Sequence, residues 1–220
     1  RVEHHQQPIF AVAATSREAA HHALSLVDIV IDESKALISN SEVVAAHIPV
    51  RPSHHMSRGD AKGAIDVADH KLAGQLEIGG QEHFYLEGQA SLAVPGENQE
   101  IMIYTSSQHP SEVQKLVAEV LDRPFHKVHV EMRRMGGGFG GKETQAAPWA
   151  CIAALLADIT QKPCKLRLSR MQDFQVTGKR HPFVQDYQLG FDNNGTLTGA
   201  IYDIKGICGI SPDLSEAIVD

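Results

Sequence analysis

The chain has 220 residues, 42% hydrophobic and 21% charged, which is the composition of a globular protein with one substantial core. Its formal net charge of −7 argues against a surface that binds nucleic acid or an anionic membrane. No apolar run approaches the roughly 20 residues of a membrane span, and no signal peptide is recognisable. The three isolated cysteines are typical of reduced residues in a cytoplasmic protein.

The first 40 residues predict a strand, a helix and a second strand. Residues 9–14 form a short apolar run, and Thr15 and Glu18 then have the spacing of a helix capping box. Residues 28–32 alternate like a strand. This unit is too small for a core of its own, so we expect it to complete a domain that begins earlier in a longer chain. Residues 41–70 are rich in Pro, Ser, His and Gly, and predict a linker with short helices.

From residue 71 onward the pattern is that of alternating strands and helices. Strands are expected at residues 71–78, 84–94, 100–105, 127–132 and 164–168. Helices are expected from Pro110 to just before Pro124 and over the apolar residues 148–157. Residues 183–191 and 196–203, joined by Asn-Asn-Gly, predict a hairpin. The sum is an α+β fold of mixed layered sheets with helices.

The most informative stretch is the glycine loop, residues 133–144. It holds five glycines in a window of six, interrupted only by Phe139. Because glycine lacks Cβ, such a loop can adopt positive φ and present backbone N–H groups to an anionic ligand. The alternative is a tight strand-to-helix connection without a ligand.

Two nucleotide-binding patterns match this loop incompletely. Residues 136–142 fit the start of a P-loop, but Glu143 stands where Ser or Thr would hold Mg²⁺. The loop also fits G-x-G-x-x-G, yet the acid at the expected spacing, Asp158, ends a predicted helix and not a strand. A P-loop-like phosphate-binding module therefore remains an alternative from a different functional class.

Two polar residues near the predicted strand ends are possible ligand contacts. Gln108 follows a predicted strand and precedes a helix, where α/β layers place ligands; an exposed loop amide is the alternative. Glu143 closes the glycine loop, either as a partner of the helix dipole or as a ligand contact. The thirteen histidines include adjacent pairs and show no zinc-type spacing, so no metal site is expected from them.

Four segments resemble, in order and spacing, the molybdenum-cofactor-binding subunit or domain of the xanthine dehydrogenase and xanthine oxidase family. They are GGQEHFYLE at 79–87, TSSQ at 105–108, RMGGGFGGKET at 134–144 and GKRHPF at 178–183. The resemblance covers essentially the whole chain. It implies that residues 1–40 are the C-terminal part of an α/β hammerhead domain, that 41–70 are the linker, and that 71–220 are the first, incomplete part of a molybdopterin-binding domain.

The resemblance also implies roles for particular residues. Gln108 matches the glutamine that hydrogen-bonds the apical oxo ligand of molybdenum. Phe139, with Gly138 and Gly140 beside it, matches the loop whose backbone approaches the metal's oxygen ligand. These residues would touch the ligands of the metal and not the metal itself, which the pterin holds. Glu143 matches the glutamate that hydrogen-bonds the purine, whereas the related aldehyde oxidases carry an apolar residue there.

The implied activity is that of a molybdenum hydroxylase that oxidises hypoxanthine and xanthine to urate in purine catabolism. Electrons would pass through 2Fe-2S clusters and FAD, on other domains or subunits, to NAD. An aldehyde oxidase-type hydroxylase is the alternative in the same superfamily, and a fragment with a structural role only is a further one. The family's catalytic base is expected in a missing C-terminal part, so no catalytic residue is assigned here. We therefore expect these 220 residues alone to be inactive, and expect the partners to be the remaining domains or subunits.

Overall fold

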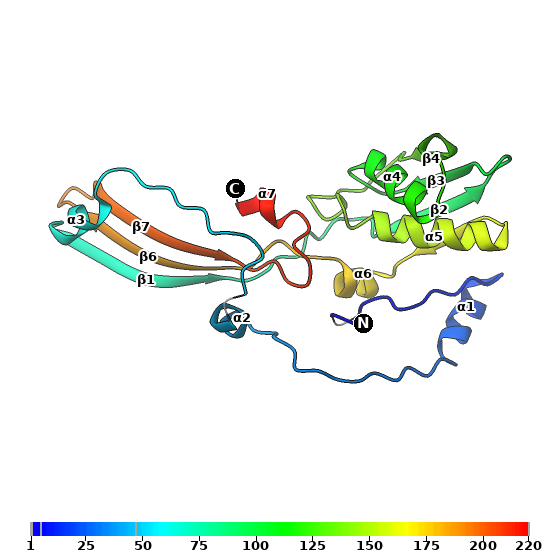
Figure 1. Ribbon diagram of the computed structural model, residues 1–220, viewed down its shortest axis with the longest axis horizontal. Helices are drawn as coiled ribbons and strands as arrows, with labels where there is room; N and C mark the ends of the chain where they lie inside the picture. Colours follow the sequence, from blue (N-terminus) through cyan, green and yellow to red (C-terminus); the bar gives the residue numbers. More distant parts are fainter. Residues whose placement is uncertain (1, 5, 47, 220) are drawn as a thin grey trace. The chain divides into compact units, whose positions relative to one another are not determined.

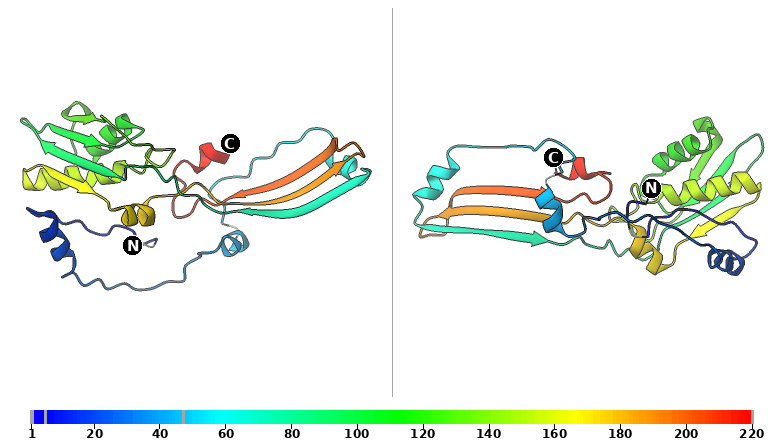
Figure 2. Two further views of the ribbon diagram at one scale, coloured as in Figure 1. Left: turned by 180° about the vertical axis from the view of Figure 1, so that it is seen from behind. Right: turned by 60° about the horizontal axis from the view of Figure 1, so that its bottom comes forward.

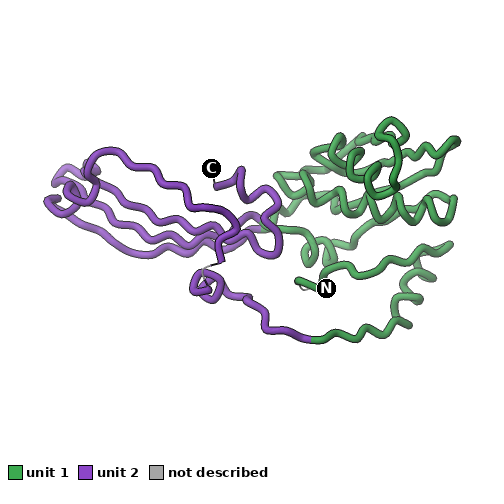
Figure 3. The backbone as a smooth tube through the Cα atoms, viewed as in Figure 1, with its two compact units in different colours: residues 1–32, 82–179 green, residues 33–81, 180–220 purple. Residues whose placement is uncertain are grey.

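The computed structural model describes residues 2–4, 6–46 and 48–219, which form two compact units. The first unit comprises Arg1–Asp32 and Glu82–Lys179, and the second comprises Glu33–Gln81 and Arg180–Asp220 (Figure 3). The two units alternate along the sequence. In the second unit, a strand that ends at Ile78 pairs with a strand that begins at Phe183, and most of the first unit lies between these two strands in sequence.

The first unit is built on a four-stranded sheet (Figure 1). Its strands are β2 (Ala90–Pro95), β3 (Ile101–Thr105), β4 (Val128–Glu131) and β5 (Cys164–Arg167), in the spatial order β4-β3-β2-β5. β2 is antiparallel to β3 and β5, whereas β3 is parallel to β4. The parallel pair requires a crossover, which α4 (Pro110–Val120) and the short 3₁₀ helix η1 (Phe125–Lys127) provide.

Two helices cover one face of this sheet. α4 and α5 (Ala147–Thr160) pack on the side to which Ala93, Ile103 and Val128 point. The part of α5 against the sheet is rich in alanine, which lets the helix approach the strands closely; its fully buried alanines are Ala150, Ala153, Ala154 and Ala157. The predicted helix after Pro110 and the predicted buried helix are both confirmed.

The remaining elements of the first unit are short helices. α1 (Arg17–Leu24) begins at the N-cap Ser16, and α6 (Arg170–Val176) begins at a full capping box between Ser169 and Gln172. Sequence analysis missed α6 because its seven residues are too few for a clear helical period.

Two predicted strand segments are wrong, and a third is correct only in its second half. Residues 9–14 and 28–32 lack strand structure, and most of their apolar side chains are exposed, with Val30 at 94%. An apolar alternation becomes a strand only when another strand pairs with it, and none in the described ranges does. The predicted strand over 84–94 begins only at Ala90, because Phe84 turns the chain with a φ of 53°.

The second unit contains a three-stranded antiparallel sheet (Figure 2). Its strands are β1 (His70–Ile78), β6 (Phe183–Phe191) and β7 (Leu197–Gly206), with β6 in the centre, and the predicted β6–β7 hairpin is confirmed. Its helices are α2 (Asn40–Ala46), α3 (Ala61–Asp66) and α7 (Ser215–Val219). α3 packs on β6 and β7 where Gly190 and Gly199 leave room for it.

The α+β class with mixed sheets and helices is thus confirmed. None of the helices within the described ranges combines the length and the hydrophobicity that crossing a membrane requires. All three cysteines are free thiols of intermediate burial.

Candidate functional site

The glycine loop joins β4 to α5 through an unusual backbone. Gly136, Gly137 and Gly140 have φ values of 67°, 90° and 89°, and Phe139 has 52°. A left-handed conformation is unfavourable for an aromatic residue, and such strain persists where the surrounding structure imposes it. The Phe139 side chain is nevertheless 73% exposed. The loop thus keeps a strained backbone although Phe139 is not buried. This disfavours the alternative of a strand-to-helix connection without a ligand.

Gln108 lies against this loop and is oriented by it. Its side-chain Oε1 accepts hydrogen bonds from the backbone N–H of Gly140 at 2.9 Å and of Lys142 at 3.2 Å. Its own backbone N–H donates to the carbonyl of Lys142 at 2.8 Å. An amide whose oxygen is engaged by two N–H donors must present its nitrogen as the free, donating end. The structure thus brings together two predicted site residues that lie 32 positions apart, with the amide donor of Gln108 available.

The glycines are needed for this contact. A Cβ at Gly138 would lie 2.3 Å from Oε1 of Gln108, and one at Gly141 would lie 2.7 Å from the His83 ring. Gly140 differs, because its nearest neighbour in that direction, Nε2 of His83, is 3.8 Å away. Because Gly138 and Gly141 have no Cβ, the loop can pack closely against Gln108 and His83. At Gly140 there is more space.

Successive backbone donors remain available in the loop. Within the described part of the chain, no hydrogen bond uses the N–H groups of Gly137, Gly138 and Phe139. Consecutive N–H groups in a segment where several residues have positive φ can form the kind of concavity that binds anionic oxygens. Together with the amide of Gln108, they make the loop a suitable neighbour for an oxo-anionic group.

Lys142 anchors the loop from inside. Its side chain is fully buried; Nζ donates to Oγ of Ser106 at 2.7 Å and to the carbonyl of Met135 at 2.5 Å. Nζ also lies 4.5 Å from the centroid of the Tyr85 ring. Burial lowers the pKa of this amine, although Glu87 opposes the shift. A lysine held this way cannot extend to a phosphate, which argues against the P-loop alternative.

The dinucleotide pattern fails for a similar reason. Asp158, the acid with the expected spacing, lies in α5 and forms an ion pair with Arg123. It therefore stabilises the fold at the end of that helix instead of standing at a strand end, where a ribose would bind.

A buried polar network supports the loop from below, and sequence analysis did not find it. Asp173 accepts hydrogen bonds from the Tyr85 hydroxyl at 2.6 Å, from Oγ1 of Thr177 at 2.7 Å and from the backbone N–H of Gln89 at 2.8 Å. Gln89 in turn donates from Nε2 to the carbonyl of Gly141 at 2.9 Å. Burial, and then the hydrogen bond to Asp173, raise the pKa of Tyr85 far above its ordinary value. The only signal for this network in the sequence is Asp173 itself, an acid in the first turn of α6, and sequence analysis did not predict that helix.

Glu143, the predicted substrate contact, directly follows Lys142 and is exposed. No hydrogen bond or ion pair among the described residues involves it. Its carboxylate is therefore not committed to the fold and stays available beside the loop.

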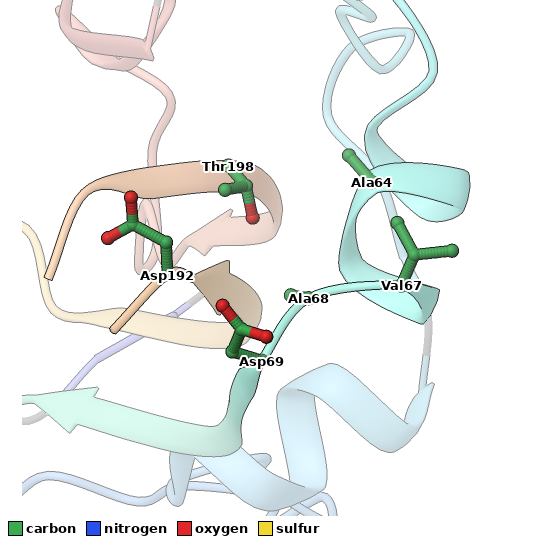
Figure 4. Close-up of a pocket in the computed structure, with 6 residues that line it drawn as sticks. All are labelled: Ala64, Val67, Ala68, Asp69, Asp192 and Thr198. Atoms are coloured by element: carbon green, nitrogen blue, oxygen red, sulfur yellow. The ribbon is translucent and has the colours of Figure 1, made fainter. Parts of the chain in front are cut away.

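The second unit has a separate small cavity of about 180 Å³, shown in Figure 4. Its two carboxylates, Asp69 and Asp192, are engaged locally: Asp192 accepts from the backbone N–H groups of Asn194 and Thr196, and Asp69 accepts from Asn193. These backbone bonds, chiefly that from Thr196, lower the pKa of Asp192. Among the described residues no group of three or more possible ligands could hold a metal ion. The cavity thus lies between α3 with the residues that follow it and the β6–β7 hairpin, and its carboxylates already have partners there.

The chain is similar to known proteins over most of its length. A xanthine dehydrogenase from Calliphora vicina is 40% identical over 216 residues, which cover 97% of this chain and 16% of that protein. A nicotinate hydroxylase from Emericella nidulans is 34% identical over 224 residues, which cover 100% of this chain and 17% of that protein. The structure of quinoline 2-oxidoreductase from Pseudomonas putida 86 has the same fold, with a TM-score of 0.75, 20% identity and coverage of 87% of this chain and 25% of that one.

The chain thus spans about 16% of the length of the curated relatives that it matches. The molybdopterin cofactor-binding domain family matches residues 44–220, which include the glycine loop, Gln108 and the network beneath them. Because this match extends over most of the chain, and because the first relative is 40% identical across nearly all of it, the chain belongs to the molybdopterin cofactor-binding domain family.

Proposed function

We propose that this chain forms one wall of the molybdenum-cofactor site in a larger hydroxylase that oxidises hypoxanthine and xanthine to urate. Electrons would leave through 2Fe-2S clusters and FAD on other domains or subunits to NAD, in the cytoplasm. The name of the 40% identical relative supports the substrate class, and the family supports the cofactor. Residues 1–40 would end a hammerhead domain, 41–70 would be the linker, and 71–220 would begin the cofactor-binding domain.

The observation that carries this proposal is the orientation of Gln108. With Oε1 bound to two loop N–H groups, Nε2 is the donating end of the amide and has no partner among the described residues, and neither do the N–H groups of Gly138 and Phe139 in the same loop. Such preorganised donors suit the oxygen ligands of a metal cofactor. When bound, the cofactor supplies oxidative hydroxylation of an electron-poor carbon. Gln108, Gly138, Phe139 and Gly140 position it, and no residue of this chain is assigned as a direct metal ligand.

Glu143 is proposed to bind the substrate. A carboxylate at the edge of the site can accept hydrogen bonds from the ring N–H groups of a purine. An aldehyde group offers no such donor, so the carboxylate would stay unpaired. The nicotinate hydroxylase relative makes another nitrogen heterocycle the second candidate, in place of a purine. An aldehyde oxidase-type activity is less favoured, because the acid at position 143 would have nothing to bind.

The test is the Gln108→Ala variant of the full-length enzyme, with turnover of hypoxanthine expressed per bound molybdenum atom. Loss of one preorganised donor should lower this turnover by about 100-fold. Gln188→Ala is the matched control, because Gln188 is an exposed glutamine on β6. Equal turnover per metal atom in Gln108→Ala and in the wild-type enzyme would remove the central support for the proposal.

A further inference from the structure

The first unit carries a basic cleft that the cofactor proposal does not use. The cleft has a volume of about 610 Å³, and none of Gln108, Phe139, Gly140 or Glu143 lines it. Its formal net charge is +3, in a chain whose net charge is −7. The charged lining consists of five basic and two acidic side chains: Arg133, Arg134, Lys165, Arg167 and Arg170, with Glu87 and Glu131.

The cleft lies on the sheet face opposite α4 and α5. Lys165 stands opposite Leu92, Leu92 opposite Tyr104, and Tyr104 opposite Glu131, so that one row crosses all four strands. Directly opposed residues share a face of the sheet, and so do residues two apart along a strand, which adds Arg167 to this face. The floor is therefore apolar and aromatic at its centre and charged at both ends.

Some of the cations in the cleft already have partners. Arg133 pairs with Glu131 at 2.5 Å, and Arg170 donates to the backbone carbonyls of Tyr85 and Leu86. In the ranges that the structure describes, no hydrogen bond or ion pair uses the other three cations, Arg134, Lys165 and Arg167. These three are the charges that an incoming ligand would meet.

The positions of these cations indicate the size of that ligand. Lys165 and Arg167 lie on β5, at one edge of the sheet, whereas Arg134 follows β4, at the other edge. Three interstrand spacings of about 4.8 Å separate the edges by roughly 14 Å. An extended polypeptide segment of about four residues spans that distance. Leu86, which also lines the cleft, is 83% exposed. An apolar floor with a charged rim is the composition of a protein interface.

We propose that this cleft is the docking surface for an acidic polypeptide segment from the rest of the larger enzyme, with Arg134, Lys165 and Arg167 pairing with its carboxylates. The chain covers only 16% of the length of its curated relatives, so the enzyme offers ample polypeptide for this role. This inference rests on one part of the proposed function, that the chain belongs to a larger enzyme. It does not depend on the substrate or on the cofactor contacts.

Lys165 permits a direct test in the full-length enzyme. Its reactivity toward an amine-acetylating reagent would be compared with that of Lys162, an exposed lysine outside the cleft with no partner in the described ranges. Lys165 should react at least tenfold more slowly than Lys162 in the folded enzyme and equally fast after denaturation. Carbodiimide cross-linking should join Lys165 to Asp or Glu residues outside the 220 positions. Equal reactivity in the folded enzyme would overturn the proposal.

Two further outcomes would also refute it. Slow acetylation without any cross-link to a carboxylate would mean that a non-acidic segment covers the cleft. Protection of Lys165 that appears only when inorganic phosphate is added would mean a small-anion site. In the Arg134→Gln/Arg167→Gln variant the cross-link yield should fall severalfold. Molybdenum content and hypoxanthine turnover, measured in parallel, test the cofactor proposal separately, because Lys165 protection does not depend on them.

Discussion

The hydroxyl of Tyr85 donates a 2.6 Å hydrogen bond to Oδ1 of Asp173, which ties the segment before β2 to helix α6. Both side chains are almost completely buried, and Asp173 accepts two further bonds, from Gln89 and Thr177. Through Gln89, the same network holds the carbonyl of Gly141 in the glycine loop. The loop that we assign to the cofactor thus rests on a polar cluster whose donors would be unpaired if the carboxylate were removed.

Replacement of Asp173 should therefore destabilise the protein strongly. In Asp173→Asn the amide nitrogen faces a donor, so at least one buried N–H or O–H loses its acceptor. We expect the free energy of unfolding to fall by about 3 kcal/mol, measured by denaturant titration. Asp66→Asn is the matched control, because Asp66 is exposed, and should change it by no more than about 0.5 kcal/mol. Similar values for the two variants would show that the network is not important for stability.

Gly138→Ala should disrupt the site locally. The new Cβ would lie 2.3 Å from Oε1 of Gln108, so the amide would have to leave its two loop donors. We expect molybdenum content of the full-length enzyme, measured by mass spectrometry, to fall at least fivefold. Gly79→Ala is the matched control, because Gly79 is an exposed glycine that, like Gly138, lacks a positive φ, and a Cβ there would meet no atom within 4 Å. That control should change the free energy of unfolding by no more than about 0.5 kcal/mol and should lose no metal. A Gly138→Ala enzyme with full metal content would contradict the packing argument.

His83 should make the protein sensitive to mild acid. Burial lowers its pKa, Lys179 adds to the shift and Glu82 opposes it; the ring also stacks on Tyr85. His83 therefore binds a proton more weakly in the folded chain than in the unfolded chain. The free energy of unfolding falls as pH drops below about 6.5, the unfolded pKa, toward the lower pKa of the folded state. His83→Gln should flatten the unfolding free energy between pH 7 and pH 5. An exposed histidine variant, His129→Gln, should leave the slope unchanged. Parallel pH profiles for wild type and His83→Gln would refute this.

Glu143→Ala should affect purine turnover more than aldehyde turnover. The carboxylate is exposed at the end of the glycine loop and makes no hydrogen bond or ion pair within the described chain, so its removal should not disturb folding. We expect kcat/KM for xanthine to fall by at least 100-fold relative to that for an aromatic aldehyde, measured with the full-length enzyme. Glu97→Ala, at another exposed glutamate, serves as the control. Equal losses on the two substrates would count against a purine-binding role.

Sequence alone predicted the glycine loop, Gln108 and Glu143 as site residues, because backbone freedom and residue spacing are local properties that the chain displays directly. It also predicted the α4 and α5 helices and the β6–β7 hairpin, whose periodicity and turn residues are likewise local. Only the tertiary structure decided that residues 9–14 and 28–32 are not strands, since a strand needs a partner that local pattern cannot supply. The burial of Lys142, the convergence on Asp173 and the direction of the Gln108 amide depend on contacts between segments up to 88 residues apart, which no local pattern encodes.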